Sequence, residues 1–370
     1  MIEVSFVGDT CFNGVFEEKL KNNNQIFTTE ISEYLKNQEF VCCNFEGPET
    51  KEINTNKIGT PLKNGNGAVA LLANNGISIF TLANNHICDY GRVGLEATIE
   101  HISTAKKSYV GAGLTAEDAF RPVIIKKENK SIALIAFSEK EKPLASAKSF
   151  GIASINGLRK LSLEIRNLKL QHNWVVLMYH GGEEFSTVPS PKKRDLLKKI
   201  ASKTGVDAII AHHSHTFQGV EIVNKKPIFY SLGNFVFDLE NHEVFPHTNE
   251  SSIVTLLFNE TGVSYTFFPT VCNSIDGKIQ KGSMKFLNEI VSRSNFDDYK
   301  MKWRKECYRL VFQRPVHKTL NPEGKSLQGH SAIRLLFSYK FYTQIIRIFS
   351  NWKLRNMYFN AIYFKISNGL

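Results

Sequence analysis

The chain has 370 residues, of which 42% are hydrophobic and 22% are charged, values typical of a globular protein and not of a disordered one. This length accommodates one large domain with an appendage, or two domains. The formal net charge of +11 is unevenly distributed, because residues 300–370 contain 14 Lys and Arg but only two acidic residues. We therefore restrict inferences from the basic character to that segment.

The N-terminal sequence MIEVSFVGDT has neither a basic n-region nor a long apolar h-region, which argues against a signal peptide. No apolar stretch reaches the length that a membrane-spanning helix requires. The six cysteines show no C-x-x-C pair and no framework spacing, so we expect reduced thiols and not disulfides. Together these features predict a cytoplasmic protein.

Apolar periodicity predicts strands alternating with helices, followed mainly by strands. Short apolar runs predict strands at residues 2–7, 40–43, 77–82, 123–125, 132–137, 174–179, 208–211, 220–223, 227–231, 253–258 and 263–268. Apolar residues one turn apart predict helices at residues 28–36, 68–74, 94–106, 158–170 and 194–203. The strands at 123–125 and 132–137 flank a charged turn and are predicted to form a hairpin. This order favours a layered α/β fold with at least one partly parallel sheet.

The composition changes beyond residue 284, where basic and aromatic helices are predicted, for example at residues 332–349. We expect a domain at residues 1–284 and a helical appendage at residues 285–370. A basic amphipathic helix can lie on anionic lipid or bind nucleic acid. Alternatively, its apolar face packs on the main domain or on a second subunit. We favour packing because the segment has too many apolar residues for an exposed surface, and we expect no nucleic-acid partner.

Residues 207–219, DAIIAHHSHTFQG, place three histidines at the end of an apolar run. Two imidazoles spaced H-x-H, His213 and His215, can both reach one side of a loop, where a metal ion could sit. The side chain of His212 should point away from that of His213. We therefore interpret His212 as structural or as a support for the ligands.

Polar side chains with metal-binding groups follow the ends of five predicted strands. These residues are Asp9, Asn44, Glu46, Asn85, His86, His180, His213 and His215. In a mostly parallel sheet the carboxyl ends of the strands share one edge, where α/β proteins bind their ligands. Taken singly, each has a structural alternative, such as a turn-forming Asp9 or a buried, hydrogen-bonded His180. Together they predict a cleft with more ligands than one tetrahedral ion uses, and therefore two ions that share a carboxylate.

Six motifs occur in the order typical of a known family. They are Gly8-Asp9, N-F-E-G-P-E-T from Asn44, N-N-H-I-C-D-Y-G from Asn84, H-G-G-E-E from His180, H-H-S-H from His212 and Y-S-L-G-N-F-V-F-D from Tyr230. With this set the chain resembles the CapA family, of the capsule or poly-γ-glutamate synthesis type, in the calcineurin-like metallophosphoesterase superfamily. The resemblance extends from residue 7 to about residue 238, roughly two-thirds of the chain.

The resemblance implies a four-layered α/β/β/α sandwich with a dinuclear metal centre. Transferred residue by residue, it implies that one ion is held by Asp9 and His215, that Glu46 bridges, and that the other ion is held by Asn85, His180 and His213. His86 would be the catalytic histidine beside the scissile phosphate, with Asp89 as a candidate orienting partner. Asn44, Glu183 and His212 are candidate supporting residues around the ligands.

Two departures from the superfamily pattern concern the first ion. The usual Asp-x-His opening is absent, because Asp9 is followed by Thr10 and Cys11, and the second motif reads Asn-Phe-Glu. Mixed nitrogen and oxygen donors suit Mn²⁺, with Fe²⁺, Zn²⁺ and Mg²⁺ as alternatives.

The expected activity is hydrolysis of a phosphorylated or polyanionic substrate by a metal-activated hydroxide, with a role in capsule or polysaccharide biosynthesis. The alternative is a non-hydrolytic assembly or export factor that binds anionic polymer. Homo-oligomers and peripheral membrane contact by the C-terminal segment remain open at this point.

Overall fold

The computed structural model describes residues 1–55, 57, 59–139, 143–155, 157–238, 245–312 and 351–369. The chain forms two compact units, Met1–Phe296 and Asp297–Leu370. The division therefore lies twelve residues beyond the expected boundary after residue 284. The physical reason is helix α8 (Met284–Arg293), whose Phe286 and Ile290 are buried in a hydrophobic core of the first unit.

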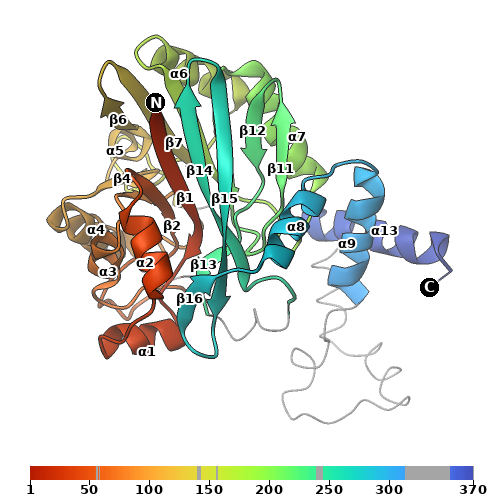
Figure 1. Ribbon diagram of the computed structural model, residues 1–370, viewed down its shortest axis with the longest axis horizontal. Helices are drawn as coiled ribbons and strands as arrows, with labels where there is room; N and C mark the ends of the chain where they lie inside the picture. Colours follow the sequence, from red (N-terminus) through yellow and green to blue (C-terminus); the bar gives the residue numbers. More distant parts are fainter. Residues whose placement is uncertain are drawn as a thin grey trace. The chain divides into compact units, whose positions relative to one another are not determined.

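The first of two large sheets has the strand order β16-β15-β14-β1-β2-β3-β4, with β13 also pairing with β1 (Figure 1). Strands β1 to β4 and β13 run parallel, whereas β14, β15 and β16 are joined by antiparallel pairing. The strands are β1 (Ile2–Thr10), β2 (Val41–Phe45), β3 (Ile79–Thr81), β4 (Ser108–Val110), β13 (Asn234–Val236), β14 (Glu250–Asn259), β15 (Gly262–Asn273) and β16 (Lys278–Lys281).

The second sheet has the order β11-β12-β10-β9-β7-β6. Its central strands are parallel, and its edge strands β6 and β11 pair antiparallel. The strands are β6 (Val123–Lys127), β7 (Lys130–Ser138), β9 (Trp174–His180), β10 (Ala208–His212), β11 (Val220–Val223) and β12 (Lys226–Phe229). Strands β6 and β7 form the predicted hairpin. A separate two-stranded sheet joins β5 (Ala112–Gly113) to β8 (Gly151–Ile152).

The two sheets pack face to face around a shared hydrophobic core. Alternate residues of one strand point to opposite faces, so Ile210 of β10 lies in the core between the sheets and Ile209 in the core beneath the helices. A strand buried on both faces needs apolar residues at every position, which explains the continuous apolar run that precedes the histidines.

Helices cover the outer face of each sheet. Side chains of α1–α4 join the core on the outer face of the first sheet, and those of α5–α7 join the core on the outer face of the second. Figure 1 shows the red and orange helices on one side and the green helix α7 on the other. The helices are α1 (Val15–Lys21), α2 (Thr29–Lys36), α3 (Ala68–Asn74), α4 (Gly91–Thr104), α5 (Ala116–Phe120), α6 (Leu158–Lys169) and α7 (Pro191–Lys203). The predicted α/β/β/α sandwich is confirmed.

The second unit contains two described helices, α9 (Tyr299–Phe312) and α13 (Trp352–Ser367). They pack through a small core of Trp303, Cys307 and Ala361, which confirms a helical C-terminal appendage. The helix predicted at residues 332–349 lies outside the described residues. In the part of the chain that the structure describes, no helix combines the length and the apolar character that crossing a membrane requires.

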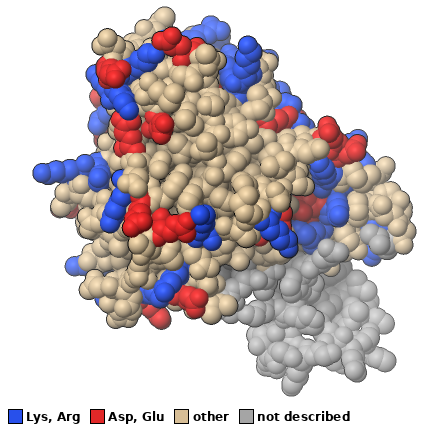
Figure 2. All heavy atoms as spheres, viewed as in Figure 1, with Lys and Arg blue, Asp and Glu red and all other residues tan. Residues whose placement is uncertain are grey.

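Charged side chains of the first unit are interspersed on the face shown in Figure 2, where blue basic groups neighbour red acidic groups. This mixed surface agrees with the near-neutral balance of the sequence outside residues 300–370. The basic character of the protein is therefore no guide to the chemistry of the first unit.

Candidate metal centre

The ends of strands from both sheets meet at the candidate site. Asp9 of β1 pairs in register with Asn44 of β2, and His180 of β9 pairs in register with His212 of β10. These four residues are the last residues within their strands, or nearly so, and do not follow the strands as expected. The site thus lies between two facing sheets and not along the edge of a single one.

Glu46 occupies the centre of the site and is fully buried. Among the described residues, neither of its carboxylate oxygens has a hydrogen-bond partner. Oε1 lies 3.8 Å from Nε2 of His180 and 3.9 Å from Nε2 of His86. Burial, followed by the negative charge of Asp9, raises the pKa of Glu46 well above its ordinary value. Because a buried carboxylate without a partner is costly, these two oxygens fit a bound cation.

One group of converging donors contains Glu46, His180 and His213. Nε2 of His180 lies 3.1 Å from Nδ1 of His213 and 2.7 Å from Oδ1 of Asn85. Burial, followed by the charge of His213, lowers the pKa of His180 well below its ordinary value. A neutral imidazole is the form that binds a metal, so the protonation state fits a ligand.

A second group contains Asp9, Glu46 and His215. Oδ2 of Asp9 lies 3.5 Å from Nδ1 of His215, and that nitrogen lies 2.8 Å from Oδ1 of Asn234. Burial tends to raise the pKa of Asp9, but the nearby imidazoles, His212 foremost, outweigh it and hold the pKa well below its usual range. Glu46 belongs to both groups.

His212 and Asn44 support Asp9. Nδ1 of His212 lies 3.1 Å from Oδ1 of Asp9, and Nδ2 of Asn44 donates to the same oxygen at 2.9 Å. Nδ2 of Asn44 also lies 3.3 Å from Nδ1 of His180. Both residues therefore orient groups that face the centre, which is the arrangement expected of supporting residues.

The loop after β10 is held in an uncommon backbone conformation. His213 and His215 have φ values of 92° and 57°, a region that residues other than glycine seldom adopt. The backbone N–H of His213 donates to Oδ2 of Asp9 at 3.2 Å. Such strain persists only where the surrounding structure enforces it, and it is common at functional sites.

His86 and Asp89 lie in the turn that follows β3. Nδ1 of His86 is 2.6 Å from Oδ2 of Asp89, and the backbone N–H of Leu62 donates to the same oxygen at 2.9 Å. Nε2 of His86 is the ring nitrogen that faces Glu46. Burial is the main reason that the pKa of His86 lies below its ordinary value.

Three residues near the site did not emerge from sequence reasoning. Lys57 contacts the turn that carries His86, but it lies in a loop whose sequence carries no signal. Asn234 contacts His215, and its place in the Y-S-L-G-N-F motif could have indicated this. The charge of Glu184, the neighbour of the expected Glu183, is one of those that raise the pKa of Glu46, after burial and the charge of Asp9. Glu183 itself is half-buried after β9.

A third cluster, His247, Glu250 and Glu289, resembles a metal site by proximity alone. Nη2 of Arg293 lies 3.0 Å from Nδ1 of His247, 3.0 Å from Glu250 and 2.9 Å from Glu289. The arginine already supplies the positive charge at this place. We therefore interpret the cluster as an ion-pair network.

The model of the family described as "Bacterial capsule synthesis protein PGA_cap" matches residues 3–239. The chain belongs to this family. The capsule synthesis assignment confirms the CapA resemblance, and the match contains every residue of the two donor groups.

Two relatives of this chain carry corresponding names. The "PGA biosynthesis protein CapA" of Bacillus subtilis (strain 168) is 28% identical over 329 residues, which cover 84% of this chain and 82% of the relative. The "Capsule biosynthesis protein CapA" of Bacillus anthracis is 31% identical over 264 residues, which cover 69% and 62%.

Solved structures with a similar fold include a novel phosphatase from Mycoplasma pneumoniae. It is 14% identical, has a TM-score of 0.48, and the similarity covers 78% of this chain and 96% of that one. At this distance we draw no conclusion about activity from it.

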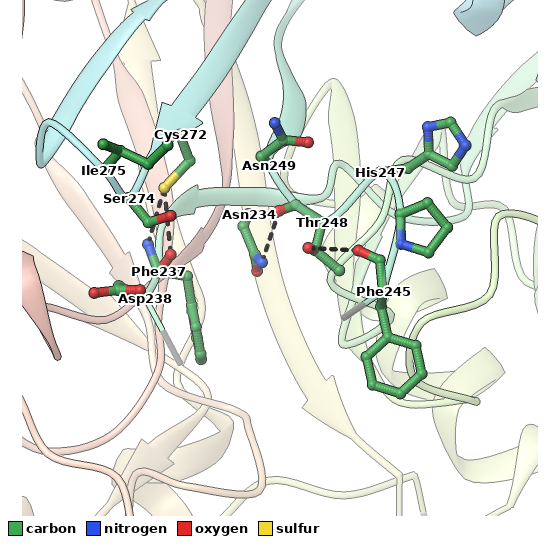
Figure 3. A pocket seen from close by; sticks show the side chains of 11 residues that line it. Asn234, Phe237, Asp238, Phe245, His247, Thr248, Asn249, Cys272, Ser274 and Ile275 are labelled. Atoms are coloured by element: carbon green, nitrogen blue, oxygen red, sulfur yellow. Dashed lines mark hydrogen bonds between the residues drawn. The ribbon is translucent and has the colours of Figure 1, made fainter. Parts of the chain in front are cut away.

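A cavity of about 460 Å³ lies beside the candidate metal centre. Figure 3 shows Asn234, Phe237 and Thr248 among the residues that line it, with Nδ2 of Asn234 donating to the backbone oxygen of Thr248 at 3.0 Å. The ring of Phe237 packs 4.7 Å from that of His215. Asn234 and Phe237 thus connect the cavity with the donor group of Asp9, Glu46 and His215.

Proposed function

We propose that the protein is a metal-dependent phosphoester hydrolase. The observation that carries the proposal is the Glu46 carboxylate, which is fully buried, has no hydrogen-bond partner among the described residues and belongs to both donor groups. A carboxylate shared by two sets of imidazole and carboxylate donors is the arrangement of a two-metal hydrolytic site.

The donors suit two divalent ions. Asp9 and His215 would hold one ion, His180, His213 and Asn85 the other, and Glu46 both. Mixed nitrogen and oxygen donors favour Mn²⁺, with Fe²⁺, Zn²⁺ or Mg²⁺ as alternatives. When bound, such ions lower the pKa of a water molecule and neutralise charge on phosphoryl oxygens.

His86 is the residue placed to move a proton. Its Nδ1 is engaged by Asp89, so Nε2 is the nitrogen available on the side of Glu46. From there it can protonate the leaving oxygen or stabilise charge on the phosphoryl group. The cavity beside His215 offers room for the part of the substrate that lies beyond the phosphoryl group.

The test is an assay of a panel of model phosphoesters with the metal-free protein and with added Mn²⁺. We expect turnover that depends on the metal and is lost in His213→Ala, because that variant lacks one donor. Metal analysis of the same preparations identifies the ion. Absence of turnover with every ion, in a protein that binds metal, would exclude the hydrolase.

The names of the relatives favour a second candidate function, a factor in assembly or export of an anionic polymer. In that role the centre would bind polymer without hydrolysing it. Binding of poly-γ-glutamate by both the wild type and His213→Ala, in the absence of phosphoesterase activity, would support this alternative.

A further inference from the structure

The loop between β2 and α3 is attached to the turn that carries His86. The hydroxyl of Thr55 donates to the backbone oxygen of Asp89 at 2.6 Å, and the backbone N–H of Leu62 donates to Oδ2 of Asp89 at 2.9 Å. Deeper in the site, Nδ2 of Asn64 donates to the backbone oxygen of Glu46 at 3.1 Å. The loop therefore contacts both the turn that carries His86 and the backbone of Glu46.

Lys57 makes the most direct contact between this loop and the candidate catalytic pair. Its Nζ donates to Oδ1 of Asp89 at 2.7 Å and to the backbone oxygen of Asn85 at 2.7 Å. The same nitrogen lies 3.3 Å from Nδ1 of His86. The side chain of Lys57 is 24% exposed and that of Asp89 only 2%, so this is a largely desolvated ion pair and not a surface one.

The two oxygens of Asp89 have different hydrogen-bond partners. Oδ2 accepts from Nδ1 of His86 and from the backbone N–H of Leu62, whereas Oδ1 accepts from Nζ of Lys57. A carboxylate held at only one oxygen can rotate, and the imidazole bound to it would rotate with it. Lys57 removes that freedom by holding the other oxygen and, through Asn85, the backbone of the same turn.

The positive charge of Lys57 also compensates the negative charge of a buried carboxylate. Asp9, Glu46 and Asp89 are all buried, and buried charges require compensation. Asp9 shares a donor group with Glu46, and Asp89 contacts the His86 ring, whose Nε2 lies 3.9 Å from Oε1 of Glu46. Lys57 compensates the outermost of the three, Asp89, which contacts His86 and belongs to neither donor group.

From this geometry we infer that Lys57 is a positioning residue of the hydrolytic site, which acts through Asp89 to hold the His86 ring with Nε2 facing Glu46. The inference rests on the proposed function for its kinetic consequence. The structural part of the inference, that Lys57 orients the His86 ring, can be tested without measuring turnover.

Lys63 provides a matched control from the same loop. Its Nζ donates to the backbone oxygen of Glu52 at 3.0 Å and lies 5.2 Å from the centre of the Tyr90 ring. It has the same charge and chain length as Lys57 but no contact with His86 or Asp89 in the described structure. Lys63→Met should therefore reproduce any general effect of removing a lysine from the loop.

The kinetic experiment compares Lys57→Met, Lys57→Arg, Lys63→Met and Asp89→Asn as metal-loaded full-length chains. Removing a group that orients a functional residue costs about 10- to 100-fold in activity. We expect a fall of that size in kcat for Lys57→Met, with KM and metal content unchanged, and partial recovery in Lys57→Arg. The double variant Lys57→Met with Asp89→Asn should be no slower than Asp89→Asn alone, because both act on one unit.

An NMR readout tests the same inference without activity. The hydrogen-bonded Nδ1 proton of His86 is identified in the metal-free protein as the imidazole signal that disappears in His86→Gln. We expect this signal to broaden or shift in Lys57→Met and to remain unchanged in Lys63→Met. Lys57→Gln serves as the second variant if Lys57→Met does not fold.

The possible outcomes separate the two proposals. An unchanged His86 signal in Lys57→Met overturns the positioning role, as does an unchanged kcat. A raised KM with normal kcat also overturns it, because that result indicates contact with substrate. If no variant hydrolyses any phosphoester but the signal changes as expected, the proposed function fails and the positioning of His86 by Lys57 stands.

Discussion

Oε1 of Glu46 lies 3.8 Å from Nε2 of His180, although Glu46 follows a strand of the first sheet and His180 ends a strand of the second. Both side chains are buried, and burial disfavours the charged form of each. The pKa of Glu46 is therefore raised and that of His180 is lowered. This is the basis of our proposal that the pair binds a cation.

Replacing Glu46 by Gln should weaken metal binding without lowering the stability of the metal-free protein. In the metal-free protein we expect Glu46→Gln to unfold at the same temperature as the wild type or higher, because a buried amide costs less than an unpaired carboxylate. Metal at 100 times its dissociation constant should stabilise the wild type by about 2.7 kcal/mol and the variant by much less. Thermal unfolding with and without Mn²⁺ measures both effects.

Glu49→Gln is the control for that experiment. Glu49 is also buried, but its oxygens accept from the backbone N–H groups of Gly67 and Val69 at the start of α3, both at 2.7 Å. Its loss should destabilise the protein by about 1–2 kcal/mol with or without metal. A metal-free Glu46→Gln that is as unstable as Glu49→Gln would contradict the metal-site interpretation.

His86→Ala should reduce turnover by orders of magnitude while the metal content stays that of the wild type. The reason is that His86 belongs to neither donor group, whereas its Nε2 faces Glu46. Element analysis and steady-state kinetics on one preparation decide the matter. Normal turnover would remove His86 from the mechanism, and loss of metal would make it a ligand.

Gly8→Ala should disturb the site through the backbone. A Cβ at Gly8 would collide with the backbone oxygen of Gly233, the atom that also accepts from the N–H of Asp9 at 2.8 Å. We expect a loss of about 1–3 kcal/mol, typical of overpacking, and weaker metal binding. Gly65→Ala is the control, since its Cβ would meet only the side chains of Glu17 and Leu20. Equal urea midpoints for the two variants would refute the prediction.

We expect Glu221, which lies outside the candidate metal centre, to make the stability of the fold depend on pH. Burial tends to raise the pKa of Glu221, but hydrogen bonds from Arg194, Lys198 and Tyr230 lower it below its ordinary value of 4.5. A carboxyl group with a lowered folded-state pKa stabilises the fold above its unfolded pKa, and this contribution is lost as the pH falls through the folded value. Glu221→Gln should cost about 1–2 kcal/mol at neutral pH.

Urea unfolding at several pH values tests this prediction. The difference between the wild type and Glu221→Gln should shrink as the pH falls below 4.5. Glu30→Gln is a suitable control, because Glu30 and its partner Lys281 are both more than half exposed and such a pair contributes little. A difference for Glu221→Gln that stays constant with pH would be the contrary result.

Local sequence pattern was sufficient for most elements of the first unit. The runs around Ile209 and Val176 predict buried strands because strands covered on both faces must be apolar throughout. Polar residues at the ends of those runs, including Asp9 and His180, can be recognised as candidate site residues, because no packing role explains them. The family motifs then suggested how these residues are grouped.

Other features depend on contacts between residues distant in sequence. No local pattern shows that β9 and β10 face β1 and β2 from a second sheet, so the expectation of a single sheet edge was wrong. Nor does any pattern show that Asn234 contacts His215.

By itself, then, the sequence determined which strands are buried and which polar side chains follow them, because burial constrains each residue independently of its distant neighbours. Tertiary structure decided that Glu46 is shared by two donor groups and that Lys57 reaches Asp89. The physical reason is that convergence of donors is set by the packing of two sheets and one loop. Such long-range pairing leaves no periodicity in the chain.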